Sequence, residues 1–128
     1  MNRFQLEQLM LLANKECIMV NTLASEGMKK YKNEVDQNER NDIFQMGSAL
    51  TVVVNEIFDK GIPETNHDKT EYCVGIIAIY CHAQRVFKLI KAIGKEKDKQ
   101  AATLCLQFVN TRIEVVHNIM FVNMNNLE

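Results

Sequence analysis

The sequence predicts an all-α fold, an antiparallel four-helix bundle with an up-down-up-down course and a long first helix. The 128 residues include one proline and five glycines, so few positions interrupt a helix. No convincing stretch alternates apolar and polar residues as a strand does. Apolar residues instead recur at helical spacing in four segments, and the short connections between them favour antiparallel neighbours. A chain of this length is expected to form a single domain, residues 1–128.

The first predicted helix runs from about residue 2 to about residue 33 and has two apolar sides. The side expected to face inward carries Leu6, Leu9, Ala13, Cys17, Val20, Ala24, Gly27 and Tyr31. Phe4, Leu11 and Ile18 recur every seven residues on roughly the opposite side. This second row needs a cover of its own, from loops, from a partner protein or from a second copy of the chain. The sequence favours an oligomer interface at these three residues.

The second predicted helix spans about residues 41–60 and follows a polar stretch at residues 32–42. The residues expected on its packing side are Ile43, Met46, Gly47, Leu50, Val53, Val54, Ile57 and Phe58. Residues 60–70 are the one segment that the sequence clearly predicts as a loop, because Gly61 suits a helix C-terminus and Pro63 prevents the helix from continuing. Asp68 and Glu71 have capping-box spacing, which predicts that Asp68 caps the third helix.

The stretch from Tyr72 to Ile93 is the expected centre of the bundle. Its first ten residues carry no charge, so the helix is expected to be covered on all sides. Gly94 is expected to end it, and the fourth helix follows at about residues 98–123.

Bulk properties favour a cytoplasmic protein. The net charge of −1 attracts neither nucleic acid nor a membrane surface. The longest uncharged run, residues 72–84, is shorter than the ~20 residues that a bilayer requires, and residues 1–16 do not have the pattern of a signal peptide. Four cysteines lie in apolar stretches without a Cys-x-x-Cys pair, which favours reduced core thiols: Cys17, Cys73, Cys81 and Cys105.

Three polar residues interrupt the apolar helix faces: Glu16, His82 and Arg112. They belong to three different helices, so they are expected to form one buried polar cluster if those helices adjoin. One interpretation is a structural ion pair between Glu16 and Arg112, with His82 hydrogen-bonded nearby. The other is an anion pocket in which Arg112 binds a phosphate or carboxylate with help from His82.

Arg112 and His117 also fit an Arg-x4–6-His motif, with the sequence Arg-Ile-Glu-Val-Val-His, and this segment resembles the HEPN family. The resemblance implies a metal-independent ribonuclease on a small all-α domain that dimerises. Arg112 would then stabilise the phosphorane charge, and His117 would act in proton transfer. The family usually has a polar residue after the arginine, where this chain has Ile113. On an ideal helix the two residues lie ~140° apart.

Glu114 and His117 have the spacing of half a ferritin-like metal site, but a second Glu-x-x-His is missing from the sequence. Neither a metal nor a cofactor is therefore predicted.

A basic patch is expected where the third helix meets the fourth: Arg85, Lys88, Lys91 and Lys95. It would suit nucleic-acid phosphates, but no aromatic residues are interleaved with it. Residues 34–71 are net acidic, and opposed charges of this kind equally favour self-association. The sequence thus favours a small interaction module that binds an unidentified partner protein, such as an adaptor, an inhibitor or an immunity-type protein. The ribonuclease and the anion-binding module are the alternatives.

Overall fold

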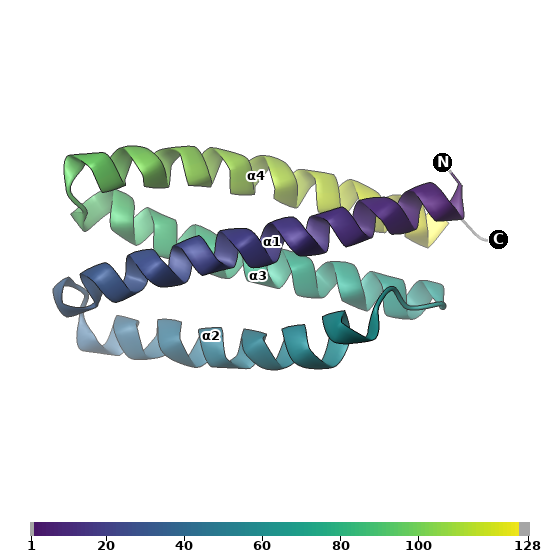
Figure 1. Ribbon diagram of the computed structural model, residues 1–128, viewed down its shortest axis with the longest axis horizontal. Helices are drawn as coiled ribbons and strands as arrows, with labels where there is room; N and C mark the ends of the chain where they lie inside the picture. Colours follow the sequence, from purple (N-terminus) through teal and green to yellow (C-terminus); the bar gives the residue numbers. More distant parts are fainter. Residues whose placement is uncertain (1, 126–128) are drawn as a thin grey trace.

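The computed structural model describes residues 2–125, which form four α-helices and no strand (Figure 1). The elements are α1 (Arg3–Tyr31), η1 (Lys32–Glu34), α2 (Gln37–Ile57), η2 (Phe58–Lys60), α3 (Asn66–Ile93) and α4 (Glu96–Asn125). Each α-helix runs antiparallel to the one before it, so α1 begins at the end of the bundle where α4 finishes (Figure 1). The predicted up-down-up-down bundle with a long first helix is confirmed. The sequence does not tell whether Leu127 and Glu128 are native residues, and both lie outside the described residues.

The central helix is α3, which packs against α1, α2 and α4. In Figure 1 α1 crosses in front of it, with α2 and α4 on either side. α1 also contacts α4, whereas α2 rests mainly on α3. Fully buried α3 side chains form the middle of the core: Tyr72, Cys73, Ile76, Ile79, Tyr80 and Ala83.

One side of α3 is open, so the prediction that this helix is covered on all sides is wrong. Val74 is 52% exposed, and Ala78 and Cys81 are also exposed. The physical reason is that a four-helix bundle gives its central helix three neighbours, and three neighbours leave one side uncovered. Cys81 on this open side is exposed, and Cys105 on α4 is half-buried, so neither is the fully buried core thiol that the sequence predicts.

α2 begins earlier than predicted because Asp36 caps it. The Asp36 carboxylate accepts hydrogen bonds from the backbone N–H groups of Asn38 and Glu39. Its buried stripe is narrow because it rests mainly on one neighbour, α3. Met46, expected on the packing side, is therefore 48% exposed.

The cap of α3 is Thr65 and not the predicted Asp68. The Thr65 hydroxyl accepts a hydrogen bond of 3.1 Å from the Asp68 backbone N–H, so the helix begins at Asn66. The preceding turn uses Gly61 at φ 80, a conformation that costs other residues strain. Gly94 ends the helix as predicted, and its N–H bonds to the Ile90 carbonyl.

Within residues 2–125, α3 is the one helix that is long and apolar enough to cross a membrane, judged by length and composition alone. Half of its most apolar window is buried inside the bundle. Because the core helix of a soluble protein meets the same criterion, this property is weak evidence for a membrane span.

Two buried tyrosines on α3 differ in whether the hydroxyl finds a partner. Asn14 on α1 donates a hydrogen bond of 2.6 Å from its Nδ2 to the Tyr72 hydroxyl. Tyr80 is equally buried, but its hydroxyl finds no hydrogen-bond partner in the described part of the chain. Burial raises the pKa of Tyr72 to about 12 and raises that of Tyr80 as well. One hydroxyl therefore fixes α1 against α3, and the other only fills space.

Tyr72→Phe is expected to lower the free energy of unfolding by about 1–2 kcal/mol, because the Asn14 amide would lose its partner inside the core. Tyr80→Phe is the matched control and is expected to leave stability unchanged or slightly higher. Urea unfolding followed by circular dichroism measures both variants. Equal losses in the two would show that the Asn14 hydrogen bond contributes nothing.

Candidate interaction site

The outward side of α1 carries large apolar side chains that no other element covers. Phe4 is 69% exposed, Met19 63%, Leu12 51% and Leu23 49%. This α1 row comprises Phe4, Leu11, Leu12, Ile18, Met19 and Leu23. The predicted interface residues belong to it, with Ile18 37% exposed and Leu11 half-buried. Residues 2–125 leave most of the row exposed, as the interface hypothesis requires, and the oligomer stays a prediction.

Glu16 and Arg112 are brought together, as the ion-pair interpretation requires. Arg112 Nη2 lies 3.2 Å from Glu16 Oε2, and the guanidinium lies over the Phe108 ring at 5.0 Å from its centroid. The Arg112 side chain is 34% exposed and the Glu16 side chain is 19% exposed. The ion pair therefore lies at the rim of the α1–α4 contact. The inward position expected for Arg112 is wrong, because a long side chain reaches from a helix face to its solvated edge.

His82 does not join this pair, so the predicted three-residue cluster is wrong in that member. His82 is buried on the side of α3 that faces α2. It lies next to Gly47 of α2, where an alanine methyl group would be 3.7 Å from the His82 Nε2. Burial, and secondarily Arg85, lower the pKa of His82, and its Nδ1 has no hydrogen-bond partner among residues 2–125. The anion-pocket hypothesis thereby loses its second group.

Tyr80 on α3 lies within electrostatic range of the Glu16–Arg112 pair, which the sequence did not predict. Burial is the main cause that raises the pKa of Tyr80, followed by Cys17; Glu16 raises it further and Arg112 lowers it. A tyrosine inside an uncharged helical stretch looks like any other apolar core residue, so no sequence signal singled it out.

The ribonuclease hypothesis gains no support from the geometry. Arg112 is engaged by Glu16 on α1, whereas His117 is exposed on α4. The two groups lie ~140° apart around an ideal helix and do not converge on one reacting atom within the chain.

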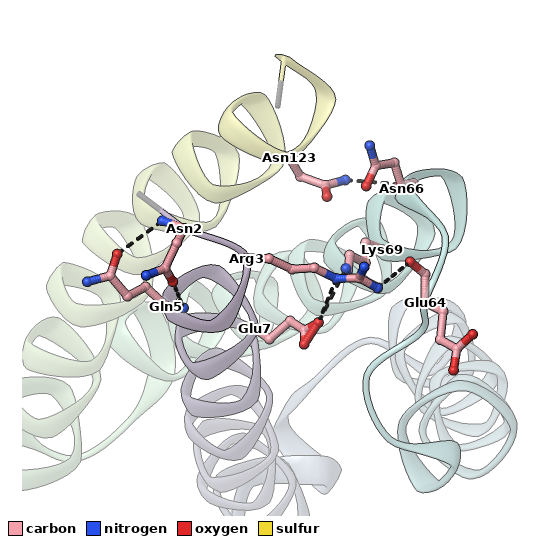
Figure 2. A network of polar contacts seen from close by, with 8 residues as sticks. All are labelled: Asn2, Arg3, Gln5, Glu7, Glu64, Asn66, Lys69 and Asn123. Carbon is pink, nitrogen blue, oxygen red and sulfur yellow. Dashed lines mark hydrogen bonds and ion pairs between the residues drawn. The ribbon is translucent and has the colours of Figure 1, made fainter. Parts of the chain in front are cut away.

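A polar network ties three elements together at the end of the bundle where α1 begins, and Figure 2 shows it. Lys69 on α3 is 1% exposed, and its Nζ lies 3.4 Å from Glu7 Oε1 on α1. Glu7 also accepts a hydrogen bond from Arg3 Nε at 3.2 Å. Arg3 Nη2 in turn donates to the Glu64 carbonyl oxygen at 2.9 Å. One carboxylate therefore serves two cations, one of which is cut off from water.

The same end holds α4 in place through Asn123, which is 1% exposed. Its Nδ2 donates a hydrogen bond of 2.9 Å to the Asn66 carbonyl (Figure 2). The same Nδ2 also donates to the Thr70 hydroxyl at 3.2 Å. The burial of Lys69 and Asn123 is not predictable from the sequence, because residues near helix ends are ordinarily solvated and nothing in the pattern marks these two as buried.

A second network fixes the opposite end of the bundle. Lys30 Nζ lies 2.7 Å from Asp98 Oδ2, and the buried Tyr31 hydroxyl donates to the same carboxylate. Tyr31 also accepts a hydrogen bond of 2.9 Å from the Lys95 backbone N–H. The hydrogen bond from Lys30 is the main cause that lowers the pKa of Asp98. Beside this network lies an apolar pocket of about 370 Å³ between α1, α3 and α4, which includes Leu23, Phe87 and Ile90.

The predicted basic patch stays a prediction, and its four residues do not all line one hollow. Arg85 lies 3.8 Å from Glu39 of α2, a loose contact between side chains that are about 40% exposed. Arg85 and Lys88 line one hollow with Cys81, whereas Lys91 and Lys95 do not. At the other end of α3, the exposed side chains of His67, Asp68 and Glu71 have ligand atoms within 4.8 Å of one another. Exposed acidic groups at a helix start are common, and we assign no metal site to them.

No protein-family model, no curated protein and no solved structure matches this chain. The function proposed below therefore rests on the geometry of the chain itself.

Glu7→Ala is expected to lower the free energy of unfolding by about 2–4 kcal/mol, because it leaves the buried Lys69 ammonium without its carboxylate. Arg3→Ala, the matched control, removes the exposed partner of the same carboxylate and is expected to cost less than about 1 kcal/mol. The double variant Glu7→Gln with Lys69→Met is expected to recover most of the loss. Guanidinium unfolding compares the four proteins, and a small effect of Glu7→Ala would show that Lys69 does not depend on it.

Stability is expected to fall as the pH drops below 6.5, the ordinary pKa of histidine, because His82 takes up a proton more readily in the unfolded chain. His82→Leu is expected to reduce the change of the thermal unfolding midpoint between pH 7.5 and pH 5.5. His117→Gln, which alters an exposed histidine, should keep the wild-type slope. A slope that survives in His82→Leu would assign the effect to another group.

Proposed function

We propose that this chain is a protein-interaction module that binds a partner protein through the α1 row. The observation that supports the proposal is the exposure of Phe4, Leu12, Met19 and Leu23, which ranges from 49% to 69%. Burying a large apolar side chain contributes roughly 1.5–3 kcal/mol, so a row of them in water is a surface that a partner stabilises by covering it. Contiguous apolar surfaces of this kind mark protein contacts.

The α1 row lies on a helix that the chain holds rigidly. Polar contacts fix α1 at several levels along its length, through Glu7, Asn14, Glu16 and Tyr31. A surface held in one conformation loses little entropy when it binds, which favours recognition by an apolar groove or by an amphipathic helix of a partner.

An adaptor, an inhibitor and an immunity-type protein all act in this way, by occupying the surface of another protein. We place this activity in the cytoplasm, because all four cysteines are free and a reducing compartment keeps thiols in that state.

The double variant Leu12→Ser with Met19→Ser tests the proposal. It is expected to weaken binding of the partner at least about tenfold, since two contact side chains lose their apolar surface. Val52→Ser is the matched control, because Val52 on α2 is 51% exposed, as Leu12 is. Tagged full-length chains are purified from the source cells, and stoichiometric co-purification is quantified by mass spectrometry. A partner retained equally by both variants, or no stoichiometric partner at all, would contradict the proposal.

A further inference from the structure

The uncovered side of α3 carries a regular row of exposed or half-buried residues: Glu71, Val74, Ala78, Cys81, Arg85, Lys88 and Ala92. This α3 strip alternates spacings of three and four residues, which is the repeat by which two helices pack along a common seam. Val74 is 52% exposed, and the side chains of Glu71 and Arg85 are 61% and 41% exposed. At 1.5 Å per residue the strip is roughly 30 Å long.

The chemistry of the α3 strip changes along its length. Val74, Ala78 and Cys81 form an uncharged middle, and Ala78 and Cys81 are small enough for another helix to approach closely. Glu71 stands at one end, and Arg85 and Lys88 stand at the other. The strip therefore offers an apolar centre flanked by opposite charges.

These charges are complementary to those of a second, antiparallel copy of the same strip. Glu71 and Arg85 are each seven residues from Ala78, so a twofold axis at Ala78 brings each Glu71 level with the other copy's Arg85. A parallel pair would instead place like charges together, which is unfavourable. The contacts that these residues make within one chain, Glu71 with His67 and Arg85 with Glu39, are both exposed. They leave the charged groups accessible to a second copy.

Apolar residues of α4 extend the same surface. Gln84 of α3 donates a hydrogen bond of 2.6 Å to Asn110 of α4, which marks the side of α4 that adjoins the strip. By helical spacing Phe121 and Met124 share that side, and they are 66% and 57% exposed. Because α3 and α4 are antiparallel and Asn123 bonds Thr70, helical rise places Phe121 at about the level of Val74.

We infer that two copies of this chain pair through the α3 strip, antiparallel, with the twofold axis at Ala78 and each Glu71 opposite the other copy's Arg85. The inference shares one premise with the proposed function, that uncovered apolar rows are contact surfaces. It concerns a different helix from the α1 row, so either can fail while the other stands.

Charge reversal tests the pairing in the full-length chain. Sedimentation analysis is expected to show a dimer for the wild type. Arg85→Glu is expected to raise its dissociation constant at least about tenfold, because like charges then face each other twice. The double variant Glu71→Arg with Arg85→Glu restores opposite charges and is expected to restore the dimer. Lys15→Glu on α1 is the control and should leave it unchanged. A monomeric wild type, or a dimer insensitive to Arg85→Glu, would overturn the inference.

Cross-linking supplies a second measurement that does not depend on charge. In a Cys81→Ser background, Ala78→Cys is expected to form a disulfide across the twofold axis under mild oxidation. Val74→Cys is expected not to, because the two copies of residue 74 would be ~12 Å apart along the seam, beyond the reach of a disulfide. Circular dichroism confirms that each variant is folded. Equal cross-linking of both variants would indicate parallel helices, and failure of Ala78→Cys to cross-link would place the contact elsewhere; either result overturns the inference.

Discussion

The packing of α3 against three other helices is the constraint on which the rest of the structure depends. Its uncharged middle, with Tyr72, Ile76 and Tyr80 fully buried, can leave water only if α1, α2 and α4 all contact it. That arrangement determines which side chains the other helices bury and which they present outward. It also leaves one side of α3 in water, because a bundle of four helices has no fifth element to cover it.

Polar contacts position α1 on this core more specifically than apolar contacts do. Glu7 reaches the buried Lys69, and Asn14 reaches the buried Tyr72 hydroxyl. At the far end of the helix, Tyr31 bonds Asp98. A shift of α1 by one turn would leave each of these groups without its partner inside the protein, which costs far more than a rearranged leucine contact. The α1 row therefore faces solvent in a fixed orientation.

Helical periodicity was sufficient to predict the bundle and the centrality of α3, and it offered the Glu16–Arg112 ion pair as one of two interpretations. It failed where the outcome depends on three-dimensional neighbours. His82 lies on an apolar helix face, as Tyr80 does, but the sequence does not tell which of the two faces α2 and which lies near Arg112. Lys69 looks like a solvated lysine near a helix start, and its burial follows from the approach of Glu7. The exposure of Val74 and Cys81 depends on how many helices pack around α3, and the local sequence does not predict that number.

The α1 row and the α3 strip both expose apolar side chains, and the α3 strip also carries opposite charges spaced for a second copy of itself. The rate at which Cys81 is alkylated tests this account most directly, because Cys81 is exposed in the middle of that strip and Cys105 lies off it, half-buried. The account predicts that the Cys81 rate falls as the concentration of wild-type protein rises, while the Cys105 rate stays constant. A Cys81 rate that is independent of concentration across the range in which the chain associates would contradict it.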